Sequence, residues 1–171
     1  GNKPQSVAWF RNKIKEFGQP KSMDLIRDGK RTSIPTFGLL NMFVYDPKLK
    51  DKLPYYDTFP LVLPIEKYNN GFLGINLHYL SIPMRIRLLD RLTETANNKK
   101  FDESTRLNAD YSKLKNVNLI KPCLKRYLAG QVKSKFRKVG ADEFIIATLL
   151  PVQKFKKQSD NHVFGKSRGM V

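Results

Sequence analysis

Residues 37–80, FGLLNMFVYDPKLKDKLPYYDTFPLVLPIEKYNNGFLGINLHYL, contain the strongest folding signals in the 171-residue chain. Asn70-Gly71 separates two apolar runs here, a pattern typical of a β-hairpin turn. The stretch predicts a small, strongly bent antiparallel sheet, with an SH3-like barrel as one possible form. Three runs in it have the length and the β-branched and aromatic content of strands: residues 37–45, 58–65 and 72–80.

Prolines and glycines indicate where this sheet bends. Pro60 and Pro64 bracket the second run, and proline has no N–H to donate to a neighbouring strand. That strand is therefore expected to be short, at a sheet edge, or kinked at both ends. Gly71 and Gly74 in the third run allow a β-bulge or a sharp bend. His78 has apolar neighbours and is expected to be structural rather than catalytic.

A helix is predicted after the sheet-forming stretch, over residues 83–92. Pro83 stands in its first turn, where proline is favoured, and apolar residues recur along one face. Arg85, Arg87 and Arg91 are placed away from that face. They are expected to be solvated, with contact to phosphates as the alternative.

Two further elements are predicted in the C-terminal third. A helix is expected over residues 122–139, because apolar residues recur there every three or four positions. Residues 144–152 are rich in β-branched and aromatic residues, which favours a strand returning to the sheet. The apolar positions of the predicted helix are Leu124, Leu128, Val132, Phe136 and Val139.

These elements predict an α+β fold in one domain, the number that a chain of this length supports. An N-terminal helical arm would occupy residues 1–36. The sheet or barrel domain would occupy residues 37–152, with a helical insertion at about 83–139. A basic C-terminal tail would follow at residues 153–171.

The charge is the clearest global property of the sequence. The chain has 32 Lys and Arg against 15 Asp and Glu, a formal net charge of +17. From Ser112 onward there are 14 basic and 3 acidic residues. A surface with this much positive charge is tolerated when an anionic partner neutralises it. Nucleic acid is the commonest such partner, followed by an acidic protein surface or anionic lipid. No apolar run reaches the roughly 20 residues that span a bilayer, so no membrane partner is expected.

The candidate contacts to nucleic acid or an acidic partner are cations of the C-terminal third. Several would share one side of the helix predicted over residues 122–139, and the others lie in the basic tail. A solvated face is the alternative. The candidates are Lys125, Arg126, Lys133, Lys135, Arg137, Lys138, Lys154, Lys156 and Lys157.

The loop between the first two apolar runs is a second candidate site. Tyr55 and Tyr56 are expected to stack on bases beside the loop lysines, as in single-strand binders. The alternative is that one of these two tyrosines packs under the loop with its hydroxyl bonded to backbone. The two acids of the loop are expected to form turns. The residues of this loop motif are Tyr45, Asp46, Lys48, Tyr55, Tyr56 and Asp57.

Trp9 and Phe10 lie in the N-terminal arm. Two exposed aromatic rings are costly in water, so they are expected to cap the sheet or to bind a neighbouring subunit.

No catalytic motif is present. The sequence has no GxGxxG, P-loop or GxSxG pattern, one cysteine, and two histidines that are far apart. Asp46 and Asp57 are the best acid pair for a metal-dependent nuclease, but turn formation is favoured. The sequence predicts no metal, no cofactor and no enzymatic activity.

The order YDPKLKDKLPYYDTFPLVLPI, then GFLGINLHYL, then EFIIATLLPVQKFKK resembles a family of small basic, virion-associated proteins of contractile-tailed bacteriophages. The likeness covers the chain from about Leu39 onward. It lies in the loop motif and in Pro47, Leu53, Pro54, Pro60, Gly71, Gly74, Asn76, His78, Tyr79, Leu150, Pro151 and Phe155. The resemblance implies a phage context, in the virion, and assigns no catalytic residue.

The leading functional hypothesis is therefore a non-enzymatic structural or assembly protein of the phage virion. It would lie in the particle and, during assembly, in the host cytoplasm. Other virion subunits would be its partners, with DNA as a second candidate. The alternative is a soluble nucleic-acid-binding protein of phage replication or DNA-end handling.

Overall fold

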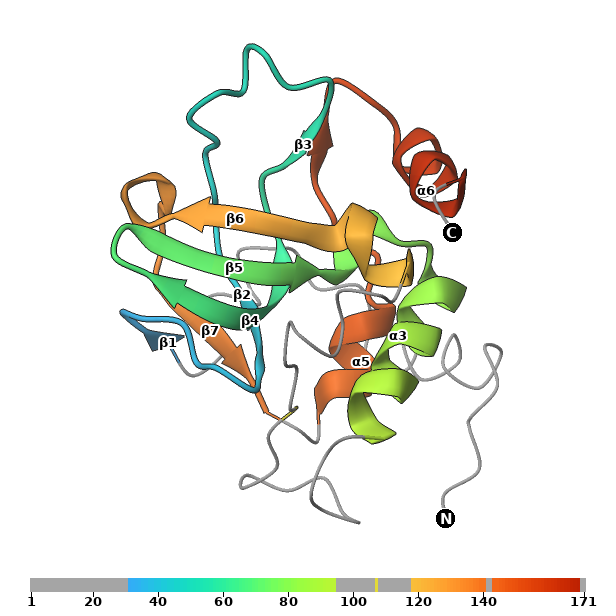
Figure 1. The fold of residues 1–171 in the computed structure, drawn as a ribbon, viewed down its shortest axis with the longest axis horizontal. Helices are drawn as coiled ribbons and strands as arrows, with labels where there is room; N and C mark the ends of the chain where they lie inside the picture. The colour runs from blue at the N-terminus through green and yellow to red at the C-terminus, as the bar shows by residue number, and fades with distance from the viewer. Residues whose placement is uncertain (1–30, 95–106, 108–117, 141–142, 170–171) are drawn as a thin grey trace.

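Antiparallel strands form the centre of the structure, a computed structural model that describes residues 31–94, 107, 118–140 and 143–169. Six strands form one sheet in the order β1-β7-β2-β4-β5-β6, and two more form a separate ribbon (Figure 1). The sheet strands are β1 (Arg31–Thr32), β2 (Leu40–Met42), β4 (Leu61–Tyr68), β5 (Gly71–Asn76), β6 (Leu124–Leu128) and β7 (Phe136–Val139). The ribbon strands are β3 (Tyr56–Asp57) and β8 (Phe155–Lys156).

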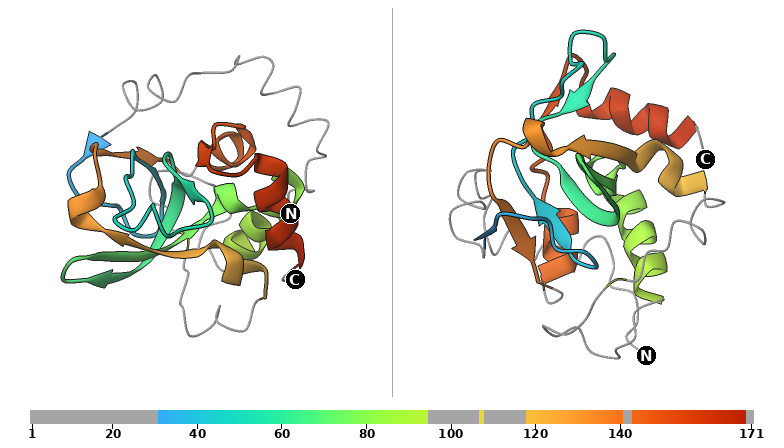
Figure 2. Two further views of the ribbon diagram at one scale, coloured as in Figure 1. Left: turned by 90° about the horizontal axis from the view of Figure 1, so that it is seen from above. Right: turned by 60° about the vertical axis from the view of Figure 1, so that its left-hand side comes forward.

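The helices lie on the side of the structure away from the turn between β4 and β5, two of them adjacent and the third nearer the ribbon (Figures 1 and 2). Two of them, α3 and α5, pack against each other, and α6 contacts two of the short 3-10 segments. The α-helices are α3 (Ile82–Glu94), α5 (Phe144–Leu149) and α6 (Asp160–Gly169). The 3-10 segments are η1 (Leu77–Tyr79), η2 (Asn118–Cys123) and η3 (Ala129–Gln131). None of the described helices is long and apolar enough to cross a bilayer.

The two faces of the sheet bury separate apolar clusters. Leu61 and Leu63 belong to the larger cluster, which includes residues of all three helices, whereas Val62 belongs to the smaller one. This alternation follows from the two-residue period of a strand. The smaller cluster is mostly aromatic, and its rings meet edge to face around Phe43. Its members are Phe43, Tyr45, Val62, Phe72, Tyr127 and Phe136.

The predicted α+β class and antiparallel sheet are confirmed. The sheet bends, and Tyr45 forms a bridge with Val132, next to η3. Among the described residues, however, the edge strands β1 and β6 do not pair with each other. The sheet is therefore no closed barrel, and the SH3-like form is not confirmed.

The hairpin between β4 and β5 is confirmed, with its turn one residue earlier than expected. Tyr68 pairs with Gly71, so Asn69 and Asn70 form the turn and Gly71 begins β5. A Cβ atom on Gly71 would collide with the carbonyl oxygen of Tyr127 on β6. Glycine is required here because two backbones approach closely.

The strand bracketed by prolines is kinked but lies inside the sheet. β4 stands between β2 and β5, so the edge and short-strand alternatives are wrong. The β4–β5 register shifts between Pro64 and Glu66, opposite Gly74 and Leu73. This β-bulge is where a strand tolerates proline.

The helix predicted over residues 122–139 does not form. The stretch folds as β6, η3 and β7 instead. Side chains of a strand return to the same face every two residues, and a spacing of four is a multiple of two. Leu124 and Leu128 would therefore share a face of a strand as well as of a helix. Pairing of β6 with β5 and of β7 with β2 decides between the two.

The strand predicted over residues 144–152 is also wrong. Residues 144–149 form α5, which packs on α3. Periodicity does not separate a short apolar run of a strand from that of a buried helix. The residues predicted as a basic tail contain β8 and α6, where Phe155 packs on Tyr79 and Val163 is buried.

Helix α3 matches the helix predicted over residues 83–92, but one of its arginines is not solvated. Arg87 and Arg91 are exposed, whereas Arg85 is fully buried. The Arg85 guanidinium donates to the carbonyl oxygens of Leu80 and His78. It also donates to carbonyl oxygens of Thr148 and Leu150 and to the side chain of Gln153. Arg85 therefore ties α3 to the segment after α5.

Candidate nucleic-acid interface

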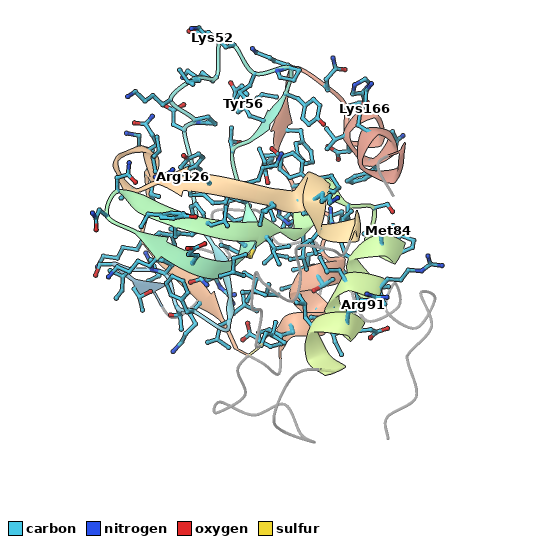
Figure 3. The ribbon with its side chains drawn as sticks, in the orientation of Figure 1. Lys52, Tyr56, Met84, Arg91, Arg126 and Lys166 are labelled. Atoms are coloured by element: carbon cyan, nitrogen blue, oxygen red, sulfur yellow. The ribbon has the colours of Figure 1, made fainter. Side chains whose placement is uncertain are left out.

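A cleft lies between the 46–55 loop and strand β6, and its volume is about 360 Å³. Figure 3 shows Lys52 and Tyr56 above the position of Arg126, with the loop over β6. The cleft brings the loop motif and two of the predicted cations together, although they are about 70 residues apart in sequence. Its lining residues are Tyr45, Pro47, Lys48, Leu49, Leu53, Tyr55, Tyr56, Asp57, Tyr79, Lys125, Arg126, Tyr127 and Leu128.

The loop above the cleft is held by a lysine from the other end of the chain. The Lys157 ammonium donates to the carbonyl oxygens of Lys50 at 2.6 Å, Asp51 at 3.3 Å and Leu53 at 2.8 Å. Lys157 has a φ of 75°, which is uncommon for a residue other than glycine. Lys157 was predicted to bind a nucleic acid or an acidic partner. In the structure it stabilises the loop through its three carbonyl partners.

The tyrosines divide between packing and lining the cleft. Tyr45 is buried, its ring lies 4.9 Å from Tyr127, and its hydroxyl accepts from the N–H of Leu128 at 2.9 Å. This packing was predicted as an alternative for Tyr55 or Tyr56 and was not predicted for Tyr45. Tyr55 and Tyr56 are half-buried and line the cleft, with Tyr55 6.1 Å from Tyr79.

Two cations of β6 lie beside aromatic rings. The Lys125 ammonium is 4.2 Å from the centre of the Tyr79 ring, and burial lowers the pKa of Lys125. The Arg126 guanidinium lies 4.5 Å from the centre of the Tyr68 ring and donates to Asn70 at 2.9 Å. Arg126 is exposed, whereas Lys125 is half-buried, so a phosphate near Lys125 would stabilise a cation that has lost part of its hydration.

A buried polar network supports the cleft from below. Asp57 is 4% exposed and accepts from the N–H groups of Phe59 at 3.0 Å and Lys154 at 3.3 Å. Asn76 donates to Asp57 and to the hydroxyl of Tyr127, both at 3.0 Å. Asp57 was predicted to form a turn, and its bond to Phe59 fits that role. The network also fixes β3 against β5 and β6.

His78 belongs to this network and is structural, as predicted. Its Nδ1 is 2.9 Å from the carbonyl oxygen of Phe59 and 3.5 Å from Asp57. A carbonyl oxygen only accepts, so Nδ1 carries the hydrogen and the neutral ring keeps a lone pair on Nε2. Nε2 is buried and has no partner among the described residues. A second proton there would create a buried donor without an acceptor, which is unfavourable.

Stability is expected to fall below a pH of about 6.5 because of His78. Burial lowers its pKa in the folded protein, so in this range the unfolded chain binds the proton and the folded chain does not. The free energy of unfolding then decreases as pH falls, by at most about 1.4 kcal/mol per pH unit, until the folded histidine also titrates. Urea unfolding between pH 7.5 and pH 5 measures this slope.

The chain has two histidines, which supplies a matched control. His78→Gln should reduce the slope, whereas His162→Gln should keep it because His162 is exposed. An unchanged slope in His78→Gln would contradict the assignment.

The other predicted cations do not join the cleft. Lys133 and Lys135 lie in the connection before β7, and Arg137 and Lys138 lie on β7. Strands β2, β4 and β5 separate β7 from β6 in the sheet. Arg137 pairs with Glu143 at 3.2 Å. The common helix side predicted for these cations with Lys125 and Arg126 is therefore wrong, because no helix carries them.

The remaining predicted residues lie in several places. Lys156 pairs with Tyr56 in the β3–β8 ribbon, and Lys154 precedes it. Asp46 forms an ion pair with Lys50 at 3.0 Å. Trp9 and Phe10, the predicted arm contacts, lie outside the described residues. Within the described ranges, no group of three or more His, Cys, Asp or Glu side chains is placed to hold a metal ion.

Sequence reasoning missed Tyr79 and Tyr127 as cleft residues. Residues 124–128, LKRYL, do not alternate strictly between apolar and polar, so no period-two pattern marked Tyr127 as part of a strand. Tyr79 lies in the third apolar run, which was predicted to be a strand throughout, but it reaches the cleft from η1.

Residues 1–168 of the 171-residue chain match the family model described as phage T4 terminal DNA protecting protein. The chain belongs to this family. No curated protein and no solved structure matches it. The resemblance to proteins of contractile-tailed phages is thus confirmed at the level of the phage type.

The leading functional hypothesis is corrected by this match. A structural or assembly protein of the virion is wrong, because the family is described by the protection of terminal DNA. The alternative, a nucleic-acid-binding protein of DNA-end handling, matches that description. The family gives no support for other virion subunits as partners.

Proposed function

We propose that this protein binds the ends of linear duplex DNA and thereby shields them from exonucleases in the infected cell. Two findings support the proposal: the family is described by terminal DNA protection, and a cleft with aromatic and cationic lining lies between the 46–55 loop and β6. The cleft is the observation that identifies which residues would bind the DNA end. Protection follows from occupying the end, so no reaction is required of the protein.

The cations around the cleft suit a phosphate backbone. Lys48 comes from the loop, Lys125 and Arg126 from β6, and Lys156 from β8 beside Tyr56. Lys48, Arg126 and Lys156 are exposed. Contacts of these cations to phosphates would give affinity and position without reading base sequence. This matches protection of ends whatever their sequence.

Removing two cleft cations is expected to weaken end protection. The Lys48→Gln/Arg126→Gln variant should bind linear duplex about 10- to 100-fold more weakly than the wild type, from the loss of two charged contacts. The slope of log K against log salt should flatten by about two, roughly 0.9 for each contact. Digestion of linear duplex by a processive exonuclease, followed over several protein and salt concentrations, measures both effects.

A matched variant separates the cleft from net charge. Arg87→Gln/Arg91→Gln removes the same charge from exposed positions on α3, and Figure 3 shows Arg91 on α3, away from the loop. It should bind and protect nearly as well as the wild type. Equal losses in the two variants would mean that overall charge, not the cleft, binds DNA. Equal affinity for covalently closed circular duplex would overturn binding to ends.

A further inference from the structure

The size of the cleft restricts what part of a DNA end enters it. Its volume of about 360 Å³ is near the lower limit of the roughly 300–1,000 Å³ typical of small-molecule sites. A base pair with both strands is too large for it, whereas a single nucleotide is a small molecule of suitable size. Of a DNA end, one strand with its base separated from its partner therefore matches the size of the cleft.

The lining has the two chemistries that a single nucleotide requires. Tyr55 and Tyr56 contribute half-buried aromatic rings, on which any base stacks, whereas Tyr79 is buried beneath the Lys125 ammonium. Lys125 and Arg126 supply cations for the adjoining phosphates. Lys125 is half-buried, with its ammonium 4.2 Å from the centre of the Tyr79 ring, so this ring holds the cation rather than a base.

Asp57 is the one carboxylate in the lining. Its oxygens already accept from two backbone N–H groups and from Asn76. The Asp57 side chain is almost fully buried. The Asp57 carboxylate therefore does not face a phosphate bound by Lys125 and Arg126.

We infer that the cleft takes one unpaired terminal nucleotide, stacking its base on the tyrosines and holding its phosphate on Lys125 and Arg126. This inference rests on the proposed function, and it explains how the protein distinguishes a DNA end from internal duplex. An internal nucleotide enters only after it is flipped out of the stack, which costs both pairing and stacking. A terminal nucleotide has one stacking neighbour, and an overhang has no pairing to lose.

Three duplexes of the same internal sequence test the inference with the full-length protein. One has a short unpaired extension at each end, one is blunt, and one has terminal base pairs joined by a covalent cross-link. Affinity should fall in that order, with the extended ends bound about 5- to 100-fold more tightly than the cross-linked ends, the range that one stacked base provides. Competition binding at one fixed salt concentration measures the differences.

Two variants assign the difference to the tyrosines. Tyr56→Leu should reduce the preference for extended over cross-linked ends to less than about 2-fold. Phe37→Leu, an exposed aromatic outside the cleft, should keep the preference. The melting temperature of each variant establishes that it is folded.

The outcomes separate this inference from the proposed function. Equal affinity for the three duplexes, or tighter binding to cross-linked ends, overturns the capture of a terminal nucleotide while end protection stands. If the wild-type protein does not slow exonuclease digestion of blunt DNA, the proposed function itself fails.

Discussion

The Arg85→Met variant is expected to lose about 3–5 kcal/mol of unfolding free energy. The Arg85 guanidinium is fully buried and donates to four backbone carbonyl oxygens and one side-chain oxygen. Burial lowers its pKa to about 10, so it remains charged at neutral pH. Methionine fills part of the volume but leaves the carbonyl groups buried without donors, at roughly 1–3 kcal/mol for each group not resatisfied. Urea unfolding monitored by circular dichroism measures the loss.

Arg87→Met is the matched control for this prediction. It makes the same change on the same helix at an exposed position and should alter stability by no more than about 0.5 kcal/mol. Arg85→Lys should recover only part of the loss, because one ammonium does not reach carbonyl groups on both sides of the site. A stability of Arg85→Met within about 1 kcal/mol of the wild type would contradict the structural role.

Gly71→Ala is expected to destabilise the protein by about 2–3 kcal/mol. The added Cβ would collide with the carbonyl oxygen of Tyr127, so β5 and β6 would have to separate where Gly71 pairs with Leu128. Because β6 also carries Lys125 and Arg126, DNA binding should weaken together with stability. Thermal unfolding and end binding of the same preparation measure both effects.

Gly130→Ala tests whether the effect is local to this contact. A Cβ atom on Gly130 meets nothing within 4 Å. That substitution should leave stability unchanged or raise it by up to about 1 kcal/mol, since alanine reduces the freedom of the unfolded chain. If both alanines had the same effect, the contact between Gly71 and β6 would not be what requires glycine.

The local signals in residues 37–92 were sufficient for part of the fold. The β4–β5 hairpin, its kink at Pro64 and helix α3 were predicted from turn residues, proline and helical periodicity. These features depend on neighbours in sequence, so a local pattern specifies them. The structural role of His78 was likewise predicted from its apolar neighbours.

The two parts of the site were predicted separately, without the contact between them. The loop motif and the basic C-terminal third were both identified, but not their meeting at β6, and the cations were assigned to a helix. A repeat of four residues fits a helix and a strand equally, and the choice depends on whether β5 offers a free edge. Lys157 shows the same limit, because nothing near it in sequence indicates its three carbonyl partners in the loop.

By itself, the sequence determined the α+β class, the antiparallel hairpin at residues 61–76 and a polycationic surface, because turn chemistry, strand content and charge are properties of neighbouring residues or of composition. Only the tertiary structure decided that residues 124–128 are a strand, that Arg85 is buried, and that Tyr55, Tyr56 and Lys125 line one cleft. Each of these depends on contacts between segments far apart in the chain, which outweigh local propensity when they bury more surface and satisfy more backbone hydrogen bonds.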